Sequence, residues 1–184
     1  MAAYGYTPRH IKACLSGELT YPDAERVNNA FDAITKPGSN LILVGPRGTG
    51  KTQIATEFGL RMSRGPLLGK MGQRYTTLSG LLQEEKDSWN RPPELDALNR
   101  PTSPLKKAKD VWLLVLDEIQ EVAGTEWEMS QFVRLFDERY GSMKSTILIS
   151  NLMPDAMQKF VGPSIWSRIT ETGMLLSCDW TSFR

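Results

Sequence analysis

Hydrophobic positions in this chain form two patterns: short unbroken apolar runs, and longer segments where apolar residues recur every three or four positions. The unbroken runs predict strands buried on both faces, at 41–45, 111–116, 145–150 and 173–178, with a further strand expected at 73–77. The recurring pattern predicts helices at 7–16, after Pro22, after Thr52, at 78–88 and at 126–140, and a helical turn or two at 154–161. Strands alternating with helices predict an α/β fold of three layers, in which a mostly parallel five-stranded sheet is covered by helices on both faces.

The length of the chain fits one domain with a full core. It has 184 residues, of which 40% are hydrophobic and 23% charged, a globular balance. We expect an N-terminal helical segment at 1–37 and a core domain at 38–184. The stretch 90–110 contains four prolines and three lysines, and it is interpreted as an exposed connection.

Charge and cysteine content exclude some classes of protein. The formal net charge of +1 neither demands nor excludes a nucleic-acid partner. Cys14 and Cys178 lie far apart and His10 has no neighbouring ligands, so neither a disulfide framework nor a zinc site is expected. No apolar run approaches the roughly 20 residues that span a bilayer, and the N-terminus has no apolar signal core. We therefore expect a cytoplasmic protein without membrane contact.

A phosphate-binding loop is predicted directly after the strand at 41–45. Its eight residues fit GxxxxGK[ST] at every fixed position: Gly45, Pro46, Arg47, Gly48, Thr49, Gly50, Lys51 and Thr52. Glycines allow the backbone N–H groups to converge on a phosphate, and the helix that follows adds its positive N-terminal end. Lys51 is expected to reach the β- and γ-phosphates of ATP and Thr52 to ligate Mg²⁺. An ordinary glycine-rich turn is the alternative, which the strand before the motif and the helix after it disfavour.

Two acidic residues and an asparagine end the next apolar strands. Asp117 is predicted to hold Mg²⁺ through its water shell, and Glu118 to activate the attacking water. Asn151 follows the strand at 145–150 and is predicted to sense the γ-phosphate or the water, because parallel strands present their carboxyl ends at one edge. The alternatives are surface acids that cap a turn and an ordinary turn asparagine.

The order of these motifs, with Ser-Arg-Ile (167–169) in a later helix, resembles the AAA+ ATPases. Four stretches resemble one branch, the DnaC/DnaI-type helicase loaders and the IstB-type transposition ATPases: 74–82, 135–152, 162–169 and 179–184. The resemblance implies a P-loop NTPase core without a separate lid domain. It assigns a trans-acting arginine finger to Arg168 and a second-sensor arginine to Arg184, each with a plain surface arginine as the alternative. The family more often has Asp-Asp where this chain has Asp117-Glu118, the pair used by the wider AAA+ group.

This resemblance implies an ATP-hydrolysing switch that forms a ring or filament of identical subunits and acts on DNA. Its partner would be a replicative helicase or, in the IstB-type alternative, a transposase. A nucleotide-dependent protein-binding module without DNA contact stays open, whereas a small-molecule kinase would need an arginine-rich lid that the sequence lacks. Candidate DNA contacts are Lys106, Lys107, Lys109, Arg74 and the stacking aromatic Tyr75.

Overall fold

The computed structural model describes residues 4–17, 19–64, 72–89 and 103–181. Within them, five strands form one parallel sheet in the order β2-β3-β4-β1-β5. The strands are β1 (Asn40–Val44), β2 (Gln73–Thr77), β3 (Leu113–Asp117), β4 (Ser145–Ile149) and β5 (Gly173–Ser177). The predicted α/β class and parallel five-stranded sheet are confirmed.

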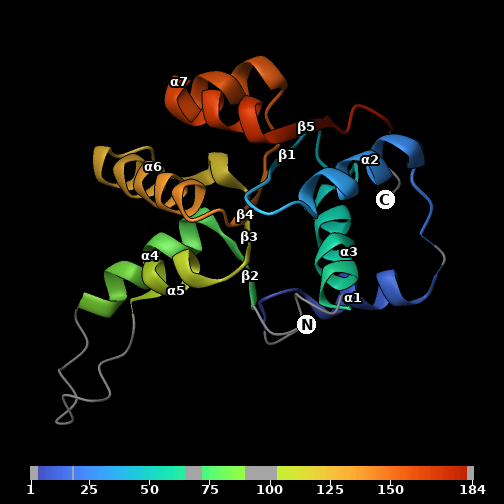
Figure 1. Ribbon diagram of the computed structural model, residues 1–184, viewed down its shortest axis with the longest axis horizontal. Helices are drawn as coiled ribbons and strands as arrows, with labels where there is room; N and C mark the ends of the chain where they lie inside the picture. Colours follow the sequence, from blue (N-terminus) through green and yellow to red (C-terminus); the bar gives the residue numbers. More distant parts are fainter. Residues whose placement is uncertain (1–3, 18, 65–71, 90–102, 182–184) are drawn as a thin grey trace, which may run out of the picture.

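Helices cover the sheet on both faces, which gives the three predicted layers (Figure 1). One face carries α2 (Ala24–Ile34) and α3 (Lys51–Ser63), with α1 (Pro8–Leu15) packed on α3. The other face carries α4 (Leu78–Trp89), α5 (Pro104–Asp110), α6 (Glu126–Gly141) and α7 (Pro154–Thr172). A single 3₁₀ turn, η3 (Ile119–Glu121), follows β3.

Each central strand divides its side chains between two hydrophobic cores. In β1, Leu41 and Leu43 pack toward α2 and α3, whereas Ile42 and Val44 pack toward the α4–α7 face. All five residues of β1 are buried, as they are in β3 and β4. This two-sided burial explains why the strands read as unbroken apolar runs, because successive side chains point to opposite faces.

The strand order places three functional connections side by side. Strand β4 pairs with both β1 and β3, so these three neighbours end at the same edge of the sheet. The glycine-rich loop follows β1, Asp117 ends β3, and Asn151 follows β4. The ends of adjacent parallel strands are the usual ligand site of such sheets.

The predicted connection at 90–110 is wrong in its last part. Residues 104–110 form α5, in which Ala108 is fully buried. Ser103 caps this helix by accepting a hydrogen bond from the Lys106 N–H at 3.3 Å, and Pro104 occupies the first turn. Serine followed by proline is a helix-start signal, which the interpretation of the prolines as loop residues overlooked. Residues 90–102 lie outside the described residues.

A buried arginine fastens α5 to the sheet. Arg139 is 0% exposed and donates to the carbonyl oxygens of Ala108 (2.8 Å) and Val111 (2.8 Å), and to the Thr146 hydroxyl (3.0 Å). Burial lowers the pKa of Arg139 to about 9. These bonds satisfy the guanidinium without a carboxylate and join α5, the start of β3 and β4.

Helix α7 is longer than the turn or two predicted at 154–161. It continues to Thr172, with a kink at Gly162 (φ 76°, ψ 168°) directly before Pro163. Proline favours the first turn of a helix, so Pro163 begins the second helical segment, which carries Arg168. The expectation of a helix at 167–169 is confirmed.

Candidate nucleotide site

The glycine-rich loop lies where its sequence predicted, between β1 and α3. Gly45 (φ 127°) and Gly50 (φ 85°) occupy the left-handed region, where glycine carries no steric penalty. A side chain at Gly45 would also clash, because its Cβ would lie 2.5 Å from the Cys178 carbonyl oxygen. Glycine at this position is therefore required both by its own backbone and by the chain directly after β5.

Lys51 folds back over this loop. Its side chain is 5% exposed, and its ammonium donates to the carbonyl oxygens of Gly45 (2.6 Å) and Pro46 (2.7 Å). The first turn of α3 thus places a positive charge inside the loop, at the helix end that already favours anions.

Thr52 and Asp117 meet beside the loop. The Thr52 hydroxyl donates to Asp117 Oδ2 at 2.8 Å, although the two residues come from α3 and β3. Asp117 is 5% exposed, and its Oδ1 accepts the Glu118 N–H at 2.7 Å. A hydroxyl and a carboxylate at contact distance form the hard oxygen donor set that suits Mg²⁺.

A second hydroxyl reaches the same carboxylate. Tyr75 on β2 donates to Asp117 Oδ2 at 2.5 Å. Burial, and then the Asp117 charge, raise the pKa of Tyr75 well above its usual value, so the phenol keeps its proton. Sequence reasoning gave Tyr75 a DNA-stacking role and missed this contact. The sequence predicted the strand at 73–77, but the pairing of that strand with β3 appears only in the structure.

Glu118 stands at the exposed end of β3 in an unusual backbone conformation. Its φ of 50° and ψ of 43° are left-handed, which costs a non-glycine residue on the order of 1 kcal/mol. The turn directs the chain into η3 and leaves Glu118 exposed next to buried Asp117. The two adjacent acids therefore differ: the Asp117 carboxylate is buried and hydrogen-bonded, whereas Glu118 is exposed to solvent.

A glutamine links this turn to Asn151. Gln120 Oε1 accepts the Ser150 hydroxyl at 2.8 Å and the Asn151 N–H at 3.2 Å. Its amide nitrogen donates to Glu121 at 3.2 Å, and Glu121 also accepts from Arg47 at 3.0 Å. Sequence reasoning missed Gln120, which ties the loop after β3 to the end of β4. Arg47 is paired with Glu121 and is largely exposed.

The C-terminal stretch contacts the loop through a tryptophan. Trp180 Nε1 donates to the Thr49 carbonyl oxygen at 2.9 Å, and the Arg26 guanidinium lies 5.8 Å from the centre of its ring. The stretch 179–184 was predicted as a family signature, but the contact of Trp180 with the loop was not foreseen. Arg184 lies outside the described residues.

Arg168 is not brought to the loop. It pairs with Asp137 of α6 at 3.3 Å, donates to the Ser164 carbonyl oxygen at 3.0 Å, and lies 5.6 Å from the Tyr140 ring centre. These contacts belong to α6 and α7. The structure therefore gathers the loop, Asp117, Glu118 and Asn151 at one edge and holds Arg168 elsewhere.

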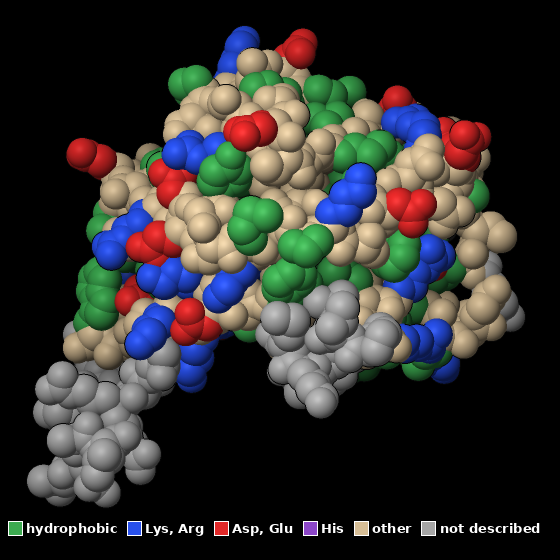
Figure 2. All heavy atoms as spheres, viewed as in Figure 1, with side chains coloured by type: hydrophobic (Ala, Val, Ile, Leu, Met, Phe, Trp, Pro, Cys, Tyr) green, Lys and Arg blue, Asp and Glu red, His purple; other side chains and the backbone are tan. Residues whose placement is uncertain are grey.

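Of the candidate DNA contacts, some form ion pairs within the chain and others are exposed. Arg74 donates to Glu84 at 2.6 Å, and Lys109 forms an ion pair with Glu138. Lys106 and Lys107 lie on the exposed side of α5. On the face shown in Figure 2, basic and acidic side chains are interspersed, without a large patch of one sign.

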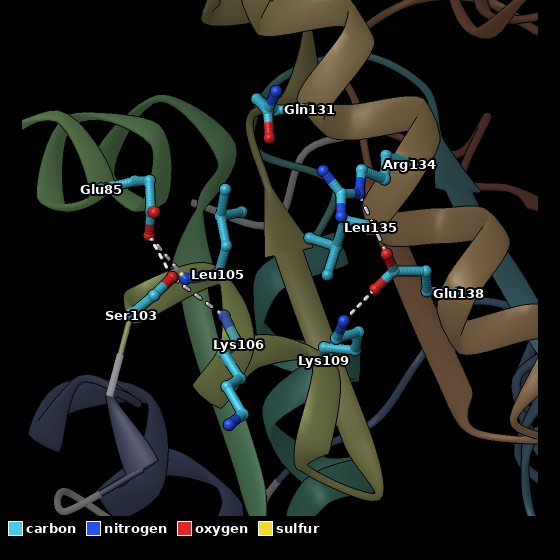
Figure 3. A pocket seen from close by; sticks show the side chains of 9 residues that line it. All are labelled: Glu85, Ser103, Leu105, Lys106, Lys109, Gln131, Arg134, Leu135 and Glu138. Carbon is cyan, nitrogen blue, oxygen red and sulfur yellow. Dashed lines mark hydrogen bonds and ion pairs between the residues drawn. The ribbon is translucent and has the colours of Figure 1, made fainter. Parts of the chain in front are cut away.

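A cavity of about 230 Å³ lies between α4, α5 and α6, apart from the nucleotide-site candidates. Figure 3 shows Arg134 and Lys109 directed at Glu138, and Glu85 directed at Ser103. Arg134, Lys109 and Glu138 thus form one group of ion pairs along the wall of the cavity.

The P-loop class of nucleotide-binding domains is defined by a glycine-rich loop between a buried parallel strand and a helix. This chain has such a loop, and Thr52 and Asp117 are hydrogen-bonded beside it. The family model described as the AAA domain (dynein-related subfamily) matches residues 40–169. The chain belongs to this AAA family.

Similarity to helicase loaders appears in both sequence and structure. The uncharacterized protein YdaV of Escherichia coli (strain K12) is 26% identical over 188 residues, which cover 98% of this chain and 71% of YdaV. The replicative helicase loader DnaC of Buchnera aphidicola subsp. Acyrthosiphon pisum (strain APS) is 25% identical over 147 residues, 79% of this chain and 56% of DnaC. A crystal structure of the DnaC helicase loader has a TM-score of 0.71 at 23% identity, covering 93% of this chain and 99% of that one. The predicted resemblance to the loader branch is confirmed.

Among the described residues, no helix is both long and apolar enough to cross a membrane.

Proposed function

We propose that this chain binds ATP with Mg²⁺ and hydrolyses it to ADP and phosphate. The observation that carries the proposal is the contact between Thr52 and Asp117 (2.8 Å) beside the loop that encloses the Lys51 ammonium. Mg²⁺ in such sites is held by one or two protein oxygens together with phosphates and water. Thr52 and Asp117 fit that requirement, and the bound ion would neutralise charge on the phosphates.

Each remaining residue of this edge has a role that its position supports. Lys51 would exchange its two carbonyl partners for the β- and γ-phosphates, since charge-assisted bonds to phosphate are stronger. Exposed Glu118 would accept a proton from the attacking water, while held Asp117 keeps its charge for the metal. Asn151, positioned through Gln120, would orient that water or the γ-phosphate.

The placement of Arg168 supports completion of the site by a second subunit. Within one chain its contacts lie on α6 and α7, away from the loop. A trans-acting guanidinium would add positive charge at the γ-phosphate only when subunits assemble, as arginine fingers do in related phosphoryl-transfer systems. The proposed assembly is a ring or filament of identical chains.

We further propose that the switch acts on DNA as a helicase loader-like protein. Similarity to DnaC over 79% of the chain supports this, and exposed Lys106 and Lys107 offer cations for phosphate contact. The chain spans only about half the length of that loader. Binding of a helicase by this chain is therefore part of the proposal. Regulation of a transposase and binding of a protein without DNA are the alternatives.

The test combines turnover with DNA binding. Phosphate release should require Mg²⁺ and rise per subunit with protein concentration. Anisotropy of labelled single- and double-stranded DNA should show tighter binding with ATP than with ADP, and binding should weaken as salt rises. ATP turnover without DNA binding in any nucleotide state would favour the protein-binding switch. No ATP binding at all would overturn the proposal.

A further inference from the structure

Tyr75 differs from the other residues of the nucleotide edge because no P-loop or acidic motif contains it. It lies in the middle of β2, where it pairs in register with Val115 of β3. From there its hydroxyl reaches Asp117 Oδ2 at 2.5 Å, the same oxygen that accepts from Thr52 at 2.8 Å. The carboxylate that we assign to the metal is therefore held partly by a strand outside the motifs.

The Asp117 carboxylate is fixed in orientation by three donors. Two hydroxyl groups donate to Oδ2, and the Glu118 N–H donates to Oδ1 at 2.7 Å. Asp117 and Thr52 are the residues that we assign to the metal ion, whereas Tyr75 is not assigned as a ligand. Among the described donors, only the Tyr75 hydroxyl approaches the carboxylate from β2, so it sets the side chain's rotation independently of α3.

Tyr75 is itself held in place by the N-terminal segment. Its ring lies 5.1 Å from the Tyr6 ring, tilted by 33°, and Tyr6 is anchored by a 3.0 Å hydrogen bond to Gln73. Gly5 packs so closely that a Cβ there would lie 2.1 Å from the Tyr75 carbonyl oxygen. The phenol thus has one preferred position, as a residue that orients a ligand requires.

We propose that Tyr75 is a positioning residue that orients Asp117 for Mg²⁺, and that it thereby lowers the Mg²⁺ concentration that nucleotide binding requires. The inference rests on the proposed binding of Mg·ATP. Groups that orient metal ligands typically change metal affinity by about 10- to 100-fold. We expect the lower end, because Asp117 keeps its bonds to Thr52 and Glu118 when Tyr75 is changed.

Tyr75→Phe tests the proposal, since it removes the hydroxyl and keeps the ring. The affinity for a fluorescent ATP analogue is titrated in EDTA and across a series of Mg²⁺ concentrations. In EDTA, Tyr75→Phe should bind the analogue as tightly as the wild type. It should need about a 10-fold higher Mg²⁺ concentration to reach half of the increase in affinity that Mg²⁺ causes. Tyr21→Phe is the matched control, because Tyr21 also donates to a carboxylate at 2.5 Å, that of Glu57, away from the site. It should behave as the wild type.

The Asp117→Asn background separates positioning from a structural effect. If Tyr75 acts through the carboxylate, adding Tyr75→Phe to Asp117→Asn should leave Mg²⁺ dependence unchanged. An equal Mg²⁺ requirement in Tyr75→Phe and Tyr21→Phe would overturn the proposal, as would a further loss in the double variant. If Tyr75→Phe fails to fold, Tyr6→Leu replaces it. Loosening the support of the Tyr75 ring should raise the Mg²⁺ requirement by up to about 10-fold, and no change would overturn the proposal. If nucleotide binding by the wild type does not depend on Mg²⁺, the proposed function itself is refuted.

Discussion

The loop edge and the Arg168 region are held together in different ways. At the loop edge, side chains from α3 and β2 and the Glu118 N–H converge on one carboxylate, that of Asp117, at 2.5 to 2.8 Å. In the Arg168 region, the guanidinium is half-exposed and bound to its own helix and to α6. The first region is organised within one chain, whereas the second presents a cation that no described residue of the loop contacts.

Because of this difference, we expect nucleotide binding and nucleotide hydrolysis to depend on different regions of the molecule. The groups of the loop edge all belong to one chain, so one subunit should suffice for nucleotide binding. An arginine that must leave an internal ion pair can contribute only after a second event, such as subunit contact. Mutations at the two regions should therefore have distinct signatures.

We expect Lys51→Ala to lose nucleotide binding, the step on which turnover depends. Removing the cation inside the loop leaves the phosphates without their side-chain partner, and losing one member of a buried charged pair costs about 2–5 kcal/mol. Affinity for a fluorescent ATP analogue should fall by about 100-fold or more. Lys159→Ala, an exposed lysine on α7, is the control. Unchanged affinity in Lys51→Ala would refute the loop assignment.

Arg168→Ala should bind ATP normally and turn it over on the order of 10³-fold more slowly, the lower range for arginine fingers. Phosphate release measures turnover, and Arg134→Ala, which also removes a surface arginine paired with an acid, is the control.

Mixing experiments then locate the arginine. Arg168→Ala supplies an intact loop and Lys51→Ala an intact arginine, so the mixture should regain activity that neither variant has alone. A mixture that stays inactive, although both variants oligomerise, would show that Arg168 acts within its own chain or only supports the fold.

Glu118→Gln should retain ATP binding and lose about 100-fold in turnover, because an amide keeps the shape but cannot accept the water's proton. Binding and phosphate release are measured on the same preparation, with Glu126→Gln as the control. Wild-type turnover in Glu118→Gln would mean that another group activates the water.

The smallest expected effect concerns the pair that holds Arg168. Asp137 Oδ1 is buried and receives no hydrogen bond from the described residues, so its 3.3 Å contact with Arg168 is a charge interaction only. Both side chains are nevertheless partly exposed, at 29% for Arg168 and 38% for Asp137, and exposed ion pairs contribute at most about 1 kcal/mol. Asp137→Asn should release Arg168 and raise turnover by about two- to fivefold at limiting protein concentration. A decrease would indicate that the pair holds Arg168 in its active position.

Local sequence patterns predicted the parts of the site that lie within one segment. The loop 45–52 is contiguous, and Asp117 and Asn151 were placed correctly because strand ends in a parallel sheet share an edge. Tyr75, Gln120 and Trp180 were missed in these roles. Each acts on a residue far away in the chain, and no periodicity records which side chains meet across strands. Helix α5 was missed for another reason: prolines outweighed the Ser103-Pro104 start signal.

The sequence by itself determined the strand pattern, the fold class and the phosphate-binding loop, because these depend on burial, glycine conformations and a short fixed spacing. The tertiary structure decided that Asp117 is fixed by Tyr75 and Thr52 together, and that Arg168 is held by α6 rather than near the loop. Hydrogen bonds between segments depend on strand order, helix packing and rotamers, which emerge only when the whole chain has folded.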